Sequence, residues 1–158
     1  MELLYCAIYF ALSGTIFFFL GRIVPKELFR YDAFPFKSFG FEQDGKIYTK
    51  IGVHKWQNKV PDMSRLFKKI MPAKNLSGKV DEKRLIVMIR ETCAAELTHF
   101  LLCITGLFCL YIWQGLGGAI VYDIYVLLGN LPFIIIQRYN RPRLLRLYMR
   151  SKKATAKE

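Results

Sequence analysis

The sequence predicts an all-α integral membrane protein with three transmembrane helices and a cytoplasmic or interfacial helical segment between the first and second. The 158-residue chain carries a net charge of +12, yet 53% of its residues are hydrophobic. These two properties are separated along the chain, because long apolar stretches alternate with basic ones. A chain of this length usually forms one domain, so residues 1–158 are expected to form a single membrane domain.

Three apolar stretches approach the roughly 20 residues that cross about 30 Å of hydrocarbon as a helix. They cover about residues 3–20, 94–113 and 119–136. The alternative, buried helices of a globular protein, is disfavoured because no polar stripe interrupts the first stretch. A signal peptide is disfavoured as well, since no basic segment precedes this stretch, no small-residue cleavage site follows it, and Arg22 comes next. We therefore expect a retained anchor.

The positions of Lys and Arg predict the orientation of the helices. Of 24 such residues, 16 lie within 22–90 and 8 within 138–157, and none precedes the first helix or falls within 114–118. Basic loops stay in the cytoplasm, so 22–92 and 137–158 are expected to be cytoplasmic and the N-terminus outside, in a multi-pass protein of the cell membrane. Anionic lipid explains the basicity better than nucleic acid, because every basic segment flanks a membrane helix.

The first basic segment has the features of an element that lies on the membrane surface. Aromatic residues recur through Phe34–Phe41, and aromatic rings favour the head-group layer. Apolar residues and lysines are mixed through Lys46–Trp56, which predicts an interfacial amphipathic helix. Pro61 would end this helix, and Asp62 or Ser64 would cap a short helix after it.

Two ionisable residues stand near the cytoplasmic start of the second membrane helix. Glu96 and His99 are three residues apart, so they share one face of a helix. A histidine beside a carboxylate suits general base catalysis, because the carboxylate fixes the ring tautomer and stabilises the charged ring. The same spacing can bind metal, but only two ligands are visible, and we predict no metal site. A purely structural polar pair between helices is the other alternative.

Polar residues of the third helix are predicted to reach a similar depth. Asn130 lies roughly 10 Å of helix before Gln137. The string Gln-Arg-Tyr-Asn-Arg-Pro-Arg at 137–143 is predicted to close this helix, and residues 151–158 are expected to be disordered. Arginine binds phosphate and carboxylate through paired hydrogen bonds, so this string is a candidate ligand site, with an ordinary positive anchor as the alternative.

Four stretches of the chain match one known family in order and spacing. They are Phe36–Glu42, then Lys55-Trp56 with Lys59 and Asp62, then Ala95–His99, and finally Asn130-Leu-Pro132 with Gln137–Leu144. The string at 137–143 is the most specific of them. On these stretches the chain resembles the glycosyl-4,4'-diaponeurosporenoate acyltransferase family, which acts last in the assembly of staphyloxanthin-type carotenoids. The first helix and residues 72–83 depart from the family pattern.

The resemblance implies an O-acyltransferase that moves a fatty acyl group from a thioester donor to a glycolipid hydroxyl at the cytoplasmic face, with a glycosylated carotenoid as one candidate acceptor. It implies acyl-CoA or an acyl carrier as co-substrate, membrane lipids as partners, no bound cofactor and no nucleic acid. His99 is the hypothetical base and Glu96 its orienting partner, while Asn130 or Asn140 would donate to the oxyanion. The predicted substrate-binding residues are Arg138, Tyr139, Asn140, Arg141, Arg143, Asn130, Gln137, Lys55, Trp56, Lys59 and Asp62.

Other functions stay open at this point. A non-catalytic membrane module that binds anionic lipid or a partner enzyme would tolerate changes at His99 and Glu96. A lipid methyltransferase would need a nucleotide-cofactor site, and the sequence has no glycine-rich phosphate loop. A transporter is disfavoured, because three helices would have to oligomerise and the charge lies on one side only. The sequence leaves the oligomeric state open.

Overall fold

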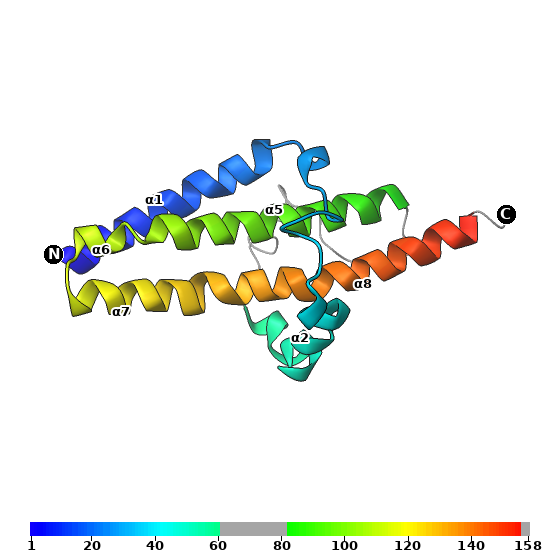
Figure 1. Cartoon of the computed structure of the whole chain (residues 1–158). Helices are drawn as coiled ribbons and strands as arrows, with labels where there is room; N and C mark the ends of the chain where they lie inside the picture. The colour runs from blue at the N-terminus through cyan, green and yellow to red at the C-terminus, as the bar shows by residue number, and fades with distance from the viewer. Residues whose placement is uncertain (61–81, 156–158) are drawn as a thin grey trace.

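Three long helical rods form the body of the protein (Figure 1). The computed structural model describes residues 1–60 and 82–155, and every regular element within them is helical. Each rod is long and apolar enough to cross a membrane, which confirms the prediction of an all-α, multi-pass protein. The first rod is α1 (Glu2–Ile23), the second is α5 (Glu82–Gly106) with α6 (Cys109–Ile112), and the third is α7 (Leu116–Ile124), the π-helical η4 (Tyr125–Asn130) and α8 (Leu131–Thr155).

The third rod extends well beyond the predicted span 119–136. α8 continues through Pro142 to Thr155, so the prediction that residues 137–143 close the helix was wrong. The prediction of disorder over residues 151–158 was wrong for 151–155, and residues 156–158 lie outside the described residues. A proline removes one backbone hydrogen bond from a helix and usually bends or breaks it. Here Pro142 is buried and its ring packs beside Gly45, so a tertiary contact supports the turn that the proline weakens.

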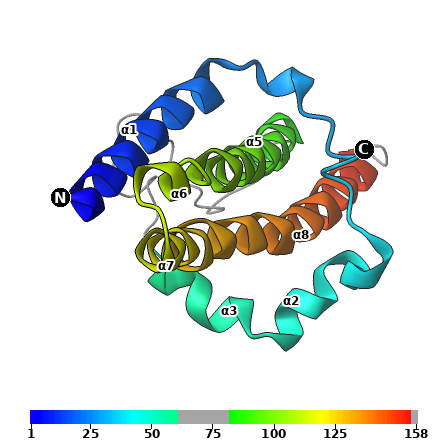
Figure 2. The same cartoon turned by 60° about the vertical axis from the view of Figure 1, so that its left-hand side comes forward.

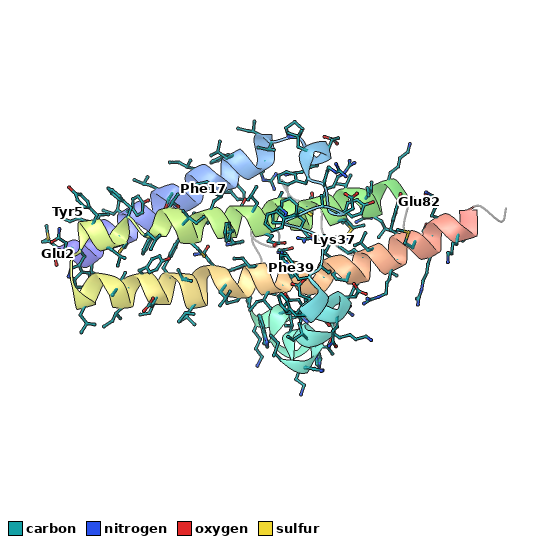
Figure 3. All side chains as sticks on the ribbon, viewed as in Figure 1. Glu2, Tyr5, Phe17, Lys37, Phe39 and Glu82 are labelled. Atoms are coloured by element: carbon teal, nitrogen blue, oxygen red, sulfur yellow. The ribbon has the colours of Figure 1, made fainter. Side chains whose placement is uncertain are left out.

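Residues 24–60, which follow the first rod, wrap around the other helices (Figure 2). Residues 24–45, called the strap below, contain η1 (Lys26–Leu28) and η2 (Gly40–Gly45). The strap leaves the end of α1 and reaches α2 (Lys46–Lys50) on the other side of α8. Its Phe29 and Phe36 pack on Cys93 and Ala94 of α5. The strap lies toward the end of the bundle where α5 begins and α8 ends, here called the basic end; Figure 3 shows Glu82 at this end and Glu2 at the opposite one.

The segment after the strap is amphipathic but is not the single helix predicted over Lys46–Trp56. It forms α2, α3 (Val53–Trp56) and η3 (Gln57–Lys59). Gly52 has a φ of 72°, a left-handed conformation that commonly ends a helix and that glycine adopts without steric cost. Tyr48 and Val53 face α8, while the lysines face outward. The predicted caps at Asp62 and Ser64 lie outside the described residues.

Gly45 is the point at which the strap turns into α2. Its φ is 88°, and a Cβ added there would lie 3.5 Å from Pro142 Cγ, an ordinary contact. Gly45→Ala is therefore expected to lower the free energy of unfolding by about 1–2 kcal/mol through backbone conformation alone. Gly40→Ala is the matched control, since its Cβ meets nothing within 4 Å and its φ is not positive. Chemical unfolding in lipid bicelles would measure both, and equal losses would contradict the expectation.

Candidate active site

Antiparallel packing of α5 against α8 brings most of the predicted polar residues into one line, called the polar column below. The line begins with His99 and Asn130 and continues toward the basic end through Glu96 and Arg138 to Arg141. The strap and α5 add members that the sequence analysis did not select. The polar column consists of His99, Asn130, Glu96, Arg138, Glu42, Thr92 and Arg141.

Two guanidinium groups hold the carboxylate of Glu96. Arg138 Nε donates to Glu96 Oε1 at 2.8 Å, and Arg141 Nη2 donates to Glu96 Oε2. Glu96 is buried, and Arg141 is only 2% exposed. A buried carboxylate is tolerable only when such partners compensate its charge. Glu96 is therefore a fixed anion between α5 and α8.

A second buried carboxylate, Glu42 of the strap, completes the charge balance. Its Oε1 accepts from Arg138 Nη1 at 2.8 Å and from the hydroxyl of Tyr48, and its Oε2 accepts from the Phe39 amide at 2.7 Å. Burial and the hydrogen bond to Glu42 raise the pKa of Tyr48, so its phenol remains a donor. Sequence reasoning missed Glu42, although an acid directly after an aromatic run was a possible signal. Two carboxylates thus face two guanidiniums.

The same arginines fasten the strap to the bundle. Arg138 Nη2 donates to the carbonyl of Pro35 at 2.6 Å, and Arg141 Nη1 donates to the carbonyl of Phe36 at 2.5 Å. Arg141 Nε donates to Thr92 Oγ1 at 2.9 Å. The guanidinium of Arg138 also lies 4.6 Å from the ring centroid of Phe39. Groups of the protein itself therefore engage both side chains, which the sequence analysis predicted to bind substrate.

His99 pairs with Asn130 rather than with Glu96. His99 Nδ1 lies 3.0 Å from Asn130 Oδ1, and Asn130 Nδ2 donates to the carbonyl of Tyr125 at 3.0 Å. Because the carbonyl can only accept, the Asn130 amide group is oriented with its oxygen toward His99. A neutral His99 must then carry its proton on Nδ1. Its Nε2 keeps a lone pair, which is the arrangement a general base requires.

The surroundings of His99 hold the ring in place. The imidazole stacks on Phe133, with ring centroids 4.5 Å apart and planes within 7°. Asn130 is 1% exposed and ends the π-helical η4, a type of turn that is frequent at functional sites. Asn130 thus takes the orienting position that the sequence analysis gave to Glu96. One N–H of its amide donates to Tyr125 and its oxygen faces His99, so the expectation that Asn130 or Asn140 donates to the oxyanion stays a prediction.

The remaining predicted residues are not gathered into the polar column. Tyr139 is buried against Tyr48 and Val53, with Trp56 beside them. Arg143 is exposed and its Nη1 donates to the Tyr139 hydroxyl at 2.6 Å. Lys55 and Lys59 are exposed on α3 and η3, Gln137 and Asn140 are partly exposed on α8, and Asp62 lies outside the described residues.

An apolar pocket of about 440 Å³ lies between α1, the strap and α5. Phe17 and Leu20 line it from α1, and Leu97 and Leu101 line it from α5. These α5 residues face α1, whereas Glu96 and His99 face α8. The pocket is therefore separated from the polar column by α5 itself. Within the described ranges, no group of three His, Cys, Asp or Glu residues is placed to bind a metal.

Comparison with known proteins gives one consistent family. The sequence model of the glycosyl-4,4'-diaponeurosporenoate acyltransferase family matches residues 31–150, a range that contains the whole polar column. A protein of that name from Staphylococcus aureus strain bovine RF122 / ET3-1 is 34% identical over 147 residues, which cover 90% of this chain and 86% of the relative. Its counterpart in strain MRSA252 is 35% identical over 148 residues with the same coverage. No solved structure matches the chain.

Proposed function

The chain belongs to the glycosyl-4,4'-diaponeurosporenoate acyltransferase family, and from this premise we propose that it transfers a fatty acyl group from a thioester to a hydroxyl of a membrane glycolipid. The first acceptor to test is glycosyl-4,4'-diaponeurosporenoate, the compound in the relatives' name. The observation that carries the proposal is the His99–Asn130 pair, which leaves Nε2 as a lone-pair acceptor in a partly buried position.

In this proposal His99 acts as the general base. Its Nε2 removes the proton from the sugar hydroxyl while the hydroxyl oxygen attacks the thioester carbonyl carbon. When the tetrahedral intermediate collapses, the C–S bond breaks and the imidazolium returns the proton to the leaving thiolate. The products are an ester and a free thiol. Asn130 keeps the Nδ1 proton in place through both steps, as an amide can orient a histidine without carrying charge.

Direct transfer is favoured over an acyl-enzyme intermediate. Within residues 1–60 and 82–155, the side-chain hydrogen bond of His99 goes to Asn130, not to a serine or cysteine that could serve as a nucleophile. An activated nucleophile is normally within hydrogen-bond reach of its base. The acceptor hydroxyl would then be activated directly by Nε2.

The basic end is proposed to face the cytoplasm, with the N-terminus outside. Within residues 1–60 and 82–155, the Lys and Arg residues belong to segments at or near this end. His99 lies five residues inside the predicted span 94–113, or about 8 Å of helix from its start. A lipid acceptor could present its sugar at this depth by lateral entry, while an anionic thioester arrives from the water phase.

Lipid mass spectrometry tests the proposed reaction. A host that accumulates the unacylated glycolipid is compared with and without expression of this chain. We expect a product heavier than the acceptor by the mass of one fatty acid minus one water, present only with the chain. An unchanged glycolipid in a host that supplies both the acceptor and thioesters would contradict acyl transfer and favour the non-catalytic module that binds lipid or a partner enzyme.

A further inference from the structure

The last turns of α8 carry cations that the polar column does not use. Arg146, Arg150, Lys152 and Lys153 are exposed, and they are called the α8 basic surface below. The one hydrogen bond of Arg146 within the described ranges is a long one, 3.4 Å to the carbonyl of Asp44. We propose that this surface docks the anionic end of a phosphopantetheine thioester, a proposal that rests on the proposed acyl transfer.

The distance of the α8 basic surface from the predicted span distinguishes it from a surface that binds lipid head groups. α8 is continuous, so Arg146 and Lys153 stand about 15 and 25 Å beyond residue 136, where the predicted span ends. The head-group layer adds only about 5–8 Å on each side of the hydrocarbon. A helix tilt of about 20° shortens these heights by only about 6%. The α8 basic surface therefore faces water, where its anionic partner must be soluble.

A different element is placed to contact lipid head groups. α2 and α3 pack through Tyr48 and Val53 against the part of α8 around Ile135 and Ile136, at the edge of the predicted span. Lys46 and Lys50 are exposed on this element, next to Ile51, which is 54% exposed. This mixture of cations and apolar side chains is typical of an interfacial element. The basic residues are thus divided between two surfaces at two heights.

A cleft beside the α8 basic surface gives it the shape of a docking site. The cleft has a volume of about 300 Å³ and lies between η2 and α8. Arg146 and Arg150 line it together with apolar Leu145 and Met149, and Asp44 lies on the opposite wall. Paired arginines suit phosphate, and the apolar wall suits the uncharged part of a nucleotide or of a protein surface.

The distance to His99 fits a long flexible donor. About 24 Å of helix separates Asn130, which contacts His99, from Arg146. This separation is comparable with an extended phosphopantetheine arm that has its phosphate at one end and its thioester at the other. Phosphates held at Arg146 and Arg150 would therefore let the thioester reach Nε2. Coenzyme A and an acidic carrier protein both present this arm, and they are distinguished by experiment.

The test compares two double variants of the purified protein in nanodiscs. Arg146→Gln with Arg150→Gln removes two cations from the α8 basic surface, and Lys46→Gln with Lys50→Gln removes two from α2 as the matched control. KM and kcat are measured for a fatty acyl-CoA and for the same acyl group on a carrier protein. We expect the arginine variant to have a KM about tenfold higher, with little change in kcat. Its KM should also depend less on salt concentration than that of the wild type.

The outcomes separate the docking proposal from the proposed function. A raised KM for acyl-CoA alone assigns the nucleotide phosphates, and one for the carrier alone assigns an acidic protein face; either supports the proposal. An unchanged KM for both donors, or an equal rise in the lysine variant, overturns it while acyl transfer stands. If the wild type transfers from neither donor, the proposed function fails. In that case, calorimetry measures the binding of coenzyme A and of the carrier to the wild type and to the arginine variant. Binding to the wild type that is lost in the arginine variant supports the docking proposal, and absence of binding to the wild type overturns it.

Discussion

Replacement of His99 by Ala is expected to lower kcat for acyl transfer by about 10²–10⁴-fold, the usual contribution of a positioned general base. The variant loses Nε2, which the pairing of Nδ1 with Asn130 leaves as the free acceptor. The measurement is the initial rate of ester formation by membranes adjusted to equal amounts of protein. Substrate KM should change little, because the proton transfer occurs only in the transition state.

His54→Ala is the matched control for this prediction. His54 is the other histidine of the chain and is exposed on α3. Its replacement should leave the rate unchanged. Asn130→Asp keeps an acceptor for Nδ1 and should retain more activity than Asn130→Leu, which releases the ring. Full activity of the His99→Ala enzyme, or equal losses in the two Asn130 variants, would contradict the assignment of base and orienting partner.

Replacement of Glu96 by Gln is expected to lower the free energy of unfolding by about 3–5 kcal/mol, the range found when one partner of a buried ion pair is removed. The change leaves Arg138 and Arg141 with Glu42 as the remaining carboxylate of the polar column. Gln has nearly the same shape, so the loss reports charge rather than packing. Thermal or denaturant unfolding in bicelles would measure it, with retained helicity showing that the variant folds.

Glu27→Gln provides the matched control, because it also removes one carboxylate from an ion pair. The Glu27 carboxylate is 72% exposed and lies 3.8 Å from Arg90 Nη1. Surface pairs of this kind contribute about 0–1 kcal/mol. Similar losses for the Glu27 and Glu96 variants would show that the buried charges of the polar column are not what holds the strap, α5 and α8 together.

The chemical identity of the site was largely predictable, whereas its pairing was not. Glu96, His99, Asn130, Arg138 and Arg141 were all selected from the sequence, because polar groups in or beside a membrane helix are rare and need a reason. Spacing along α5 correctly placed Glu96 and His99 toward the same neighbour. It could not determine which residue of the third rod each would meet, since that depends on the relative shift of the two rods along their axes.

Contacts that join distant parts of the chain were the main omissions. Glu42 reaches Arg138 only because the strap crosses α8, and the positive φ values of Gln43 and Asp44 then turn the chain into α2. Such values are unusual for residues other than glycine, so local propensity does not predict them. Gly52, which divides the expected amphipathic helix, was a local signal that the apolar pattern concealed.

The sequence by itself determined the membrane class, the three helices of membrane-spanning length and the family, because apolar length matches bilayer thickness directly and because the short motifs occur in order along the chain. The tertiary structure alone decided that Asn130 orients His99, and that Arg138 and Arg141 clamp the strap. It also decided that the exposed cations Arg146 and Arg150, which the polar column does not contact, lie farther along α8. The physical reason is that a buried guanidinium takes whichever carboxylates and carbonyls the packing brings to it, and packing is a property of the whole chain.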